Sequence, residues 1–189
     1  LLIHDFANTP ISQETTGRDV FVVSVKGGST KIRNSILYDF ELFNNNASSS
    51  IGALRYSSSG THYIHNVTIY DVKNTVSTGS TRGVDNSSSP SATLKNVAVF
   101  DVENTIDGEE CIYGATSQSN NVSSDDTATG PGSRTGKTNY ASYFVNTANG
   151  HEDLHLLADS YMLWGTTGTA LDTDPNLPVT SDIDGEPRD

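Results

Sequence analysis

The sequence predicts an all-β solenoid, and three observations lead to this prediction. A nine-residue pattern recurs at intervals of about 30 residues, each copy contains a short run of alternating apolar and polar residues, and segments rich in Ser, Gly, Asn and Thr separate the runs. Alternation over four or five residues is typical of half-buried strands, and the runs are too short for helices. Units of two or three short strands bury an apolar face only when they stack on one another, so the repeat indicates a solenoid.

The repeat is clearest in "LLIHDFANT" (1–9), "VTIYDVKNT" (67–75) and "VAVFDVENT" (97–105). "SILYDFELF" (35–43) matches the first six columns, and "VSSDD" (122–126) is a weaker copy. The shared aspartate falls at Asp5, Asp39, Asp71, Asp101 and Asp126, so the interval shortens from each copy to the next. A leucine-rich repeat would have a tighter period and more Leu, and propeller blades would need longer units of four strands. A parallel β-helix of about five coils fits best.

Length and composition predict one domain and exclude some partners. The 189 residues are 34% apolar and carry a formal net charge of −12, which repels phosphate backbones and anionic membrane surfaces. We therefore expect neither nucleic acid binding nor membrane insertion. The single Cys111 excludes an internal disulfide framework and leaves the redox compartment open. We expect coils over 1–126, a loop over 127–140, and a last coil with an acidic tail over 141–189.

The repeat units and the C-terminal segment together resemble right-handed parallel β-helix repeat proteins of the surface, secreted or phage-particle type. In their closing segments an F-x-(D/N) start, a D-x-H-L run, a Ser-led turn and a final D-I-D-G-x-x-R recur. The matching positions here are Phe144, Asn146, Asp153, His155, Leu156, Ser160, Asp182, Ile183, Asp184, Gly185 and Arg188. Trp164 and the inserted Glu152 depart from this pattern. The resemblance implies a right-handed helix with a C-terminal closing segment, located outside the cell or on a cell or virion surface.

Alternation within each unit predicts two columns of side chains on the stacked coils. The apolar phase forms interior ladders from Leu1, Ile3, Leu37, Ile69 and Val99. The opposite phase forms an outward column of His4, Tyr38, Tyr70 and Phe100, continued by Asp125. Aromatic rings repeated at about 4.8 Å would suit sugar rings, which stack on π faces. The alternative is that a loop, the C-terminal segment or a neighbouring subunit covers the column.

The shared aspartates are expected at corners of the coil. Unit charges about 4.8 Å apart would repel by roughly 3.5 kcal/mol at an effective dielectric near 20, which excludes a buried ladder of unpaired carboxylates. Asp71 would share the inward phase of Ile69 although Val72 is the next apolar residue, so the chain must turn there and the carboxylate can accept backbone N–H groups. A bound cation or a catalytic pair is the alternative. We expect the preceding asparagines to be stacked corner amides, at Asn34, Asn66, Asn96 and Asn121.

Two groups of carboxylates are candidates for acid–base chemistry. Asp125 and Asp126 are adjacent, and Asp107, Glu109 and Glu110 precede Cys111. Glycoside hydrolysis needs such a pair, one protonated and one ionised. Neither group carries the Gly-His and Arg-x-Lys elements of the polygalacturonase-like members of the resembled family.

A lyase would need a cationic group beside its base, and the chain has no Lys/Arg cluster near an acidic one. His62 and His65 are the only nearby imidazole pair, and we expect His65 to be an exposed strand residue.

Metal sites are not expected. "HEDLH" (151–155) has the spacing of a zinc motif, but "NTANG" before it breaks a helix and no His follows it. We expect a strand there. "DTDPN" (172–176) and "DIDG" (182–185) echo the oxygen spacing of calcium loops without the closing Glu, so calcium in the acidic tail is the one alternative to the absence of any cofactor.

We therefore expect a non-catalytic structural module of an extracellular or virion surface, which binds glycans or partner subunits through the aromatic column. Other copies or a larger assembly would cover the end of the solenoid at residue 1, because a bare end exposes an edge and core. The alternative is a polysaccharide-degrading enzyme, a lyase or a hydrolase, whose acidic site lies in the loops around 107–126.

Overall fold

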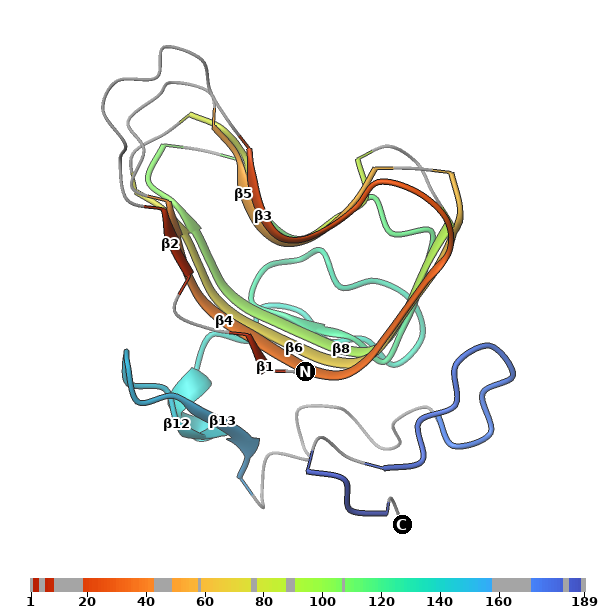
Figure 1. The fold of residues 1–189 in the computed structure, drawn as a ribbon. Helices are drawn as coiled ribbons and strands as arrows, with labels where there is room; N and C mark the ends of the chain where they lie inside the picture. Colours follow the sequence, from red (N-terminus) through yellow and green to blue (C-terminus); the bar gives the residue numbers. More distant parts are fainter. Residues whose placement is uncertain are drawn as a thin grey trace.

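The computed structural model describes residues 2–3, 6–8, 19–42, 49–57, 59–75, 78–87, 91–106, 108–157, 171–181 and 184–187. Within these residues the protein is all-β with parallel sheets, and its only helical turn is the 3-10 turn η1 (Tyr140–Ser142) (Figure 1). No helix of the described residues is long and apolar enough to cross a membrane. The prediction of an all-β protein with parallel pairing is confirmed.

Two parallel sheets form the body of the molecule, and the chain alternates between them. The long-strand sheet contains β1 (Leu2–Ile3), β2 (Phe6–Asn8), β4 (Thr30–Leu42), β6 (Thr61–Asn74), β8 (Ser91–Asn104), β10 (Ser117–Ser119) and β11 (Val122–Ser123). The short-strand sheet contains β3 (Val20–Val25), β5 (Ile51–Tyr56), β7 (Thr81–Asp85) and β9 (Glu109–Tyr113). One long strand and one short strand make one repeat unit.

The pairing register follows the repeat of the sequence. β1 pairs with β4 through Leu2 and Ile36, β4 with β6 through Ile36 and Thr68, and β6 with β8 through Thr68 and Ala98. Each of these pairs joins equivalent positions of neighbouring copies, so the register is the one that the aligned aspartates predict. The pairing of the first four units was therefore predictable from the sequence.

Each long strand bends twice, at an asparagine and at an aspartate with left-handed backbone conformation. In β6 these residues are Asn66 (φ 55°) and Asp71 (φ 57°), and neither has a partner in the register. Asn and Asp adopt this conformation more readily than other residues with a Cβ, because their short polar side chains bond locally. The bends divide β6 into three legs, 61–65, 67–70 and 72–74, so that the long-strand sheet wraps around the interior. The predicted corners are confirmed in β4, β6 and β8.

The fifth unit is shifted by one position from the predicted alignment. Val122 pairs with Ala98 and Ser123 with Val99, and the left-handed residue is Asn120 (φ 51°) instead of Asn121. The pairing of β10 with β8 keeps this same shifted register. The tandem asparagines allow either alignment by pattern, and packing selects the one that places Val122 in an apolar cluster.

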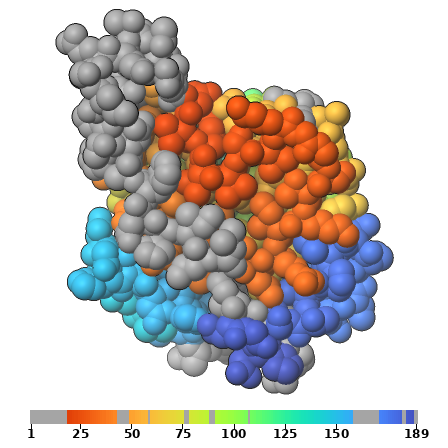
Figure 2. Space-filling view, in the orientation of Figure 1, coloured from red at the N-terminus to blue at the C-terminus, as the bar shows by residue number. Residues whose placement is uncertain are grey.

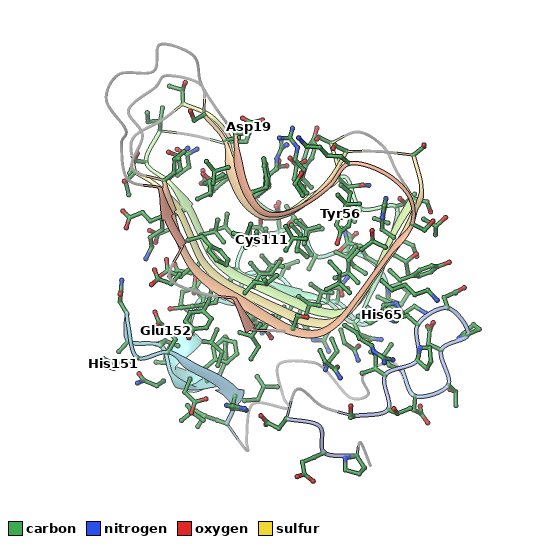
Figure 3. The ribbon with its side chains drawn as sticks, viewed as in Figure 1. Asp19, Tyr56, His65, Cys111, His151 and Glu152 are labelled. Atoms are coloured by element: carbon green, nitrogen blue, oxygen red, sulfur yellow. The ribbon has the colours of Figure 1, made fainter. Side chains whose placement is uncertain are left out.

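The core lies between the two sheets, and its middle ladder is the predicted one. Leu37, Ile69 and Val99 are buried and neighbour one another in the register. Ile3 pairs with Leu37 through its backbone, and Leu1 lies outside the described residues. Residues from the short-strand sheet close the core from the other side, and Tyr56 and Cys111 point into it (Figure 3).

Two C-terminal segments cover the outer face of the long-strand sheet. β12 (Phe144–Asn146) and β13 (Asp153–Leu156) form an antiparallel hairpin outside the middle legs. The predicted closing strand at 153–156 is therefore a strand, but it pairs with β12 and does not stack as a further parallel coil. In each long strand the first leg is the part before the asparagine bend. Residues 171–181 run along the outside of the first legs of β4, β6 and β8. Both segments lie on the same side of the molecule in Figure 2, in light and dark blue.

Candidate functional site

The aromatic column exists, but it is covered. Tyr38, Tyr70 and Phe100 are neighbours in the register, and all three are buried, Phe100 completely. The hairpin ring Phe144 lies 6.1 Å from Tyr70 and 5.7 Å from Phe100, centroid to centroid, and Tyr140 lies 5.6 Å from Tyr70. The expected exposed row for sugar stacking is therefore wrong, and the alternative of cover by the C-terminal segment describes the structure. His4 lies outside the described residues.

Asp125 is a corner residue and not a member of the outward column. Continuing the register past Ser123 places Ser124 beside Phe100 and Asp125 beside Asp101. The Asp125 carboxylate accepts hydrogen bonds from the Cys111 backbone N–H (2.7 Å) and from the Thr127 N–H (3.0 Å) and hydroxyl (2.6 Å). Burial alone would raise the pKa of Asp125, but these hydrogen bonds outweigh burial and hold that pKa below its ordinary value.

The predicted place of Asp125 in the outward column is therefore wrong, and Asp125 and the adjacent Asp126 have different surroundings. Asp125 accepts a hydrogen bond from one backbone N–H of β9, that of Cys111, whereas Asp126 is exposed to solvent. The other candidate carboxylates also differ: Glu109 is exposed, and Glu110 lies beside an arginine. Asp107 lies outside the described residues.

The outer face of the short-strand sheet carries the most concentrated set of functional groups. In the register, Phe21, Gly52, Arg82 and Glu110 share one column, and Ser24, Arg55, Asp85 and Tyr113 share another. Two columns between them face the core, as the buried Ala53 and Leu54 show. In a regular strand, side chains alternate between the two faces, so only one of the two columns between the outward ones would face the core. The sheet therefore bends there, and its ribbon curves toward the long-strand sheet (Figure 1). The bend brings the two outward columns together.

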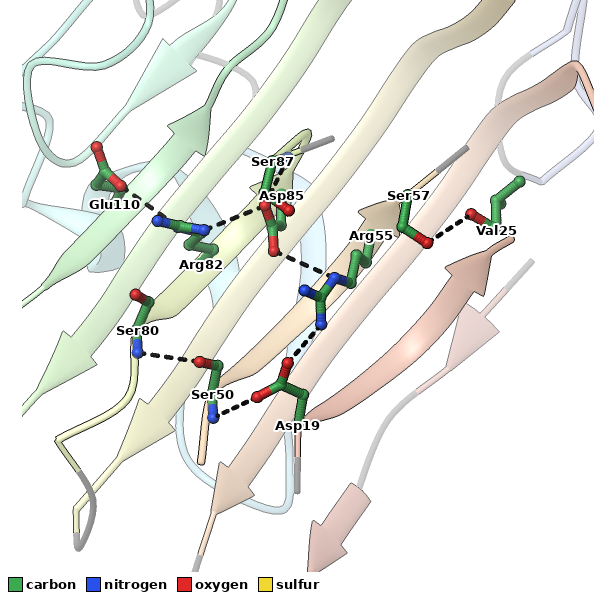
Figure 4. A network of polar contacts seen from close by, with 10 residues as sticks. All are labelled: Asp19, Val25, Ser50, Arg55, Ser57, Ser80, Arg82, Asp85, Ser87 and Glu110. Atoms are coloured by element: carbon green, nitrogen blue, oxygen red, sulfur yellow. Dashed lines mark hydrogen bonds and ion pairs between the residues drawn. The ribbon is translucent and has the colours of Figure 1, made fainter. Parts of the chain in front are cut away.

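Five charged side chains form a ladder across this face, from Asp19, just before β3, to β9 (Figure 4). Arg55 pairs with Asp19 (Nη1 to Oδ2, 2.7 Å) and with Asp85 (Nε to Oδ2, 3.6 Å). Arg82 pairs with Asp85 (Nη1 to Oδ1, 3.2 Å) and with Glu110 (Nε to Oε2, 3.4 Å). Asp85 is buried between the two guanidinium groups, whereas the side chains of Asp19 and Glu110 are 40% and 35% exposed. We call these five residues the charge ladder.

Each arginine of the charge ladder also lies over an aromatic ring. The Arg55 guanidinium carbon is 4.4 Å from the Phe21 centroid, and that of Arg82 is 3.6 Å from the Tyr113 centroid. A Cβ at Gly52 would lie 2.5 Å from the Phe21 ring, so glycine at this position makes room for the ring. Tyr113 remains 36% exposed while Arg82 holds one side of it. The face therefore combines an immobilised, accessible ring with exposed carboxylates.

A second charged cluster lies at the aspartate corner. The Lys73 ammonium is 2.7 Å from Asp71 and 3.9 Å from Asp101. Burial raises the pKa of Asp101 to about 6, with smaller contributions from Glu103 and Asp71, although Lys73 opposes the change. A lysine thus pairs with the aspartates of this corner, where backbone N–H groups were expected.

His62 and His65 are both buried, which corrects the expectation of an exposed His65. They point to opposite sides of β6. The His62 ring packs 4.6 Å from Tyr56 inside the core, whereas His65 lies on the outer side and its Nδ1 is 3.0 Å from the Leu177 carbonyl oxygen (Figure 3). Because they lie on opposite faces, they do not act as an imidazole pair.

The zinc spacing does not produce a metal site in the described residues. Residues 153–156 are extended, His151 is exposed, and His155 is held by Asp153 (2.5 Å) and Asp184 (3.0 Å). No group of three potential metal ligands occurs within the part of the chain that the structure describes. In the first acidic motif the Asp174 carboxylate accepts the N–H groups of 176 and 177, as in a tight turn. Residues 182–183 of the second motif are outside the described residues.

Only part of this site was visible in the sequence. Glu110 was a candidate, but Arg55, Arg82 and Tyr113 were not, because the two arginines occupy different columns and no repeat aligns them. Comparisons with protein-family models, with curated proteins and with solved structures found no match to the chain. Function is therefore inferred from the residues themselves.

Proposed function

We propose that this chain is a right-handed parallel β-helix module with a structural, non-catalytic role on an extracellular or virion surface, and that its charge-ladder face binds glycans. The alternation of the chain between two parallel sheets supports the β-helix, as does a register that pairs equivalent positions of neighbouring repeats. The general right-handedness of crossovers between parallel strands supports the hand. Repeats that stack in this way produce an extended rigid surface, which suits a structural role.

The state of the candidate carboxylates supports a non-catalytic role. Asp125 is held ionised by three hydrogen bonds, and Glu110 is paired with Arg82. A general acid needs a carboxyl group that keeps its proton near the working pH. The lowered pKa of Asp125 is the opposite of what that role requires.

The observation that carries the glycan proposal is the Tyr113 ring stacked on Arg82. A sugar ring binds to a flat aromatic surface through its apolar face, and its hydroxyls bond to nearby carboxylates and guanidinium groups. Fixing the ring beforehand lowers the entropy cost of binding. Here Arg82 fixes the ring, while Glu110 and Asp19 stay partly exposed as acceptors.

The test is binding of the intact protein to a panel of immobilised neutral and acidic polysaccharides. We expect Tyr113→Ala to weaken binding about tenfold or more, equivalent to about 1.4 kcal/mol. Ile106→Ala is the matched control, because Ile106 is also an exposed apolar residue but lies outside the charge ladder. The proposal is wrong if the wild-type protein binds no member of the panel, or if both variants bind as tightly as wild type.

A polysaccharide-degrading activity is the second candidate, and one observation favours it. Asp101, with its pKa raised to about 6, lies near Asp71, so two carboxyl groups of one cluster occupy different environments. Incubation with the same polysaccharides would release reducing ends or unsaturated products if this candidate were correct. Asp101→Asn would then abolish the release, whereas the structural proposal expects no product from either protein.

A further inference from the structure

Three basic side chains occupy one column on the outside of the first legs. Arg33, His65 and Lys95 are neighbours in the register of β4, β6 and β8, at a spacing of about 4.8 Å. The chain has 11 Lys and Arg residues against 23 Asp and Glu, so an uninterrupted basic column is unusual in it. We call these three residues the basic column.

Residues 171–181 lie across the basic column and contact every member of it. The Asp174 carboxylate is 2.5 Å from the Lys95 ammonium, the Leu177 carbonyl is 3.0 Å from His65 Nδ1, and the Pro178 carbonyl accepts from Arg33. Asn34, next to Arg33, donates to the Ser181 carbonyl (2.8 Å). The segment therefore crosses three units in order, from β8 to β4, with at least one polar contact to each unit.

The contact between His65 and the Leu177 carbonyl fixes which nitrogen carries the proton in the neutral ring. Because a carbonyl oxygen can only accept, Nδ1 carries the proton and Nε2 carries the lone pair. Nε2 is buried and has no hydrogen-bond partner among the described residues. Protonation would place an N–H and a positive charge at this atom, where no acceptor receives them.

The groups around His65 give protonation little compensation. Lys95 repels a positive ring, whereas Asp174 attracts it but already binds Lys95. Arg33 adds a further positive charge in the column, and the Tyr63 ring lies edge-on, 6.2 Å away. Burial is the largest influence and, together with Lys95, outweighs the Leu177 carbonyl and Asp174, so the pKa of His65 is lowered.

We propose that residues 171–181 form a pH-sensitive latch, closed over the basic column at neutral pH and opened in mild acid by protonation of His65. Opening lets the imidazolium reach water, which removes the cost of burying its charge. The opened face would present Arg33, His65 and Lys95 together, without the Asp174 carboxylate that pairs with Lys95 in the closed state. The latch does not depend on glycan binding or on the absence of catalysis.

The test is amide hydrogen exchange of the full chain, read by peptide, at pH 7.5 and pH 5.0 after correction for the intrinsic exchange rate. We expect the protection of residues 171–181 to fall at least tenfold at pH 5.0, while core amides around 64–69 keep theirs. His65→Asn keeps a donor for the Leu177 carbonyl but does not titrate, so its protection should be the same at both pH values. A wild-type latch with equal protection at both pH values overturns the proposal, as does an equal loss in His65→Asn.

Two further readouts separate the latch from other causes. Loss of protection over the core at pH 5.0 would mean global unfolding and would also overturn the proposal. If His65→Asn does not fold, Lys95→Met removes the repelling charge and leaves the Asp174 carboxylate to compensate a protonated His65. The fall in latch protection between pH 7.5 and pH 5.0 should then be smaller than in the wild type. A fall as large as that of the wild type, or larger, counts against the role of His65.

Discussion

Truncation of Phe144 tests whether the hairpin is a permanent part of the fold. Phe144 opens β12, is 1% exposed, and packs on Tyr70 and Phe100 from two different units. Phe144→Ala removes the ring that joins the hairpin to the outer aromatic column. If the hairpin is integral, its loss must lower the stability of the whole protein.

The magnitude follows from complete burial and from the ring contacts. Truncation of a buried Phe to Ala costs about 3–5 kcal/mol, and each edge-to-face pair contributes roughly 0.5–1.5 kcal/mol beyond area burial. Phe144 makes two such pairs, at interplanar angles of 65° and 75°. The site lies at the surface of the body and can collapse in part, so we expect a loss of about 3 kcal/mol.

Urea unfolding followed by tyrosine fluorescence and far-UV circular dichroism measures this loss. The matched control is Val145→Ala, because Val145 is the next residue of the same strand and is 53% exposed. We expect this control to change the free energy of unfolding by no more than about 0.5 kcal/mol. Hydrogen exchange over 144–157 should report early opening only in Phe144→Ala.

A loss below about 1 kcal/mol, with unchanged exchange in the hairpin, would refute this reasoning. It would mean that the hairpin is not anchored by Phe144 and that Tyr70 and Phe100 are accessible in solution. The outer aromatic column would then again be a candidate ligand surface.

Two further predictions concern the core and the aspartate corner. Gly83→Ala should cost about 1–3 kcal/mol in the free energy of unfolding, since its Cβ would lie 2.2 Å from a Val99 methyl and 2.7 Å from the Cys111 carbonyl oxygen; Gly27→Ala, with nothing within 4 Å, is the control, and equal melting temperatures would contradict the packing. Asp101 has a folded pKa of about 6 against an ordinary 3.8, so the folded state binds its proton more tightly, and the contribution of Asp101 to stability should rise as the pH falls from 7 to 4, by up to about 3 kcal/mol. Urea titrations at several pH values should show this rise reduced in Asp101→Asn, and an identical pH profile in the two proteins would contradict the assignment.

The features that were predictable from the sequence are those fixed within one unit or by the alignment of one unit with the next. Ile69 and Val99 face inward because alternation and the corner aspartates fix the phase of each leg, and the register between β4, β6 and β8 follows from the repeat itself. The last unit was misaligned by one position because Asn120 and Asn121 fit the corner equally well by pattern. Burial of Val122 against Ala98 decides between them, and that contact is not a local signal.

The features that were not predictable depend on distant segments or on the bend of a sheet. Alternation correctly placed Tyr70 and Phe100 on the outside, but nothing local shows that residues 140–157 cover them. The charge ladder depends on the bend of the short-strand sheet, which brings Arg82 over Tyr113 although they belong to different columns. The sequence predicted an exposed His65 because Leu177, whose carbonyl oxygen contacts the ring, lies far away in the chain.

The two C-terminal covers also change how the stack holds together. In a solenoid each unit contacts only its neighbours, so stability is close to a sum of local terms and the ends open first. Residues 171–181 contact three units at once, and Phe144 contacts two. Within the sheets each strand pairs only with the strands next to it, so these two segments add contacts that tie several units together. Opening the latch should therefore weaken the coupling between β4 and β8 without removing a strand from either sheet. Acid should loosen the N-terminal part of the stack, at β1, β2 and β4, before it unfolds the middle at β6. This order distinguishes a released brace from a general loss of stability.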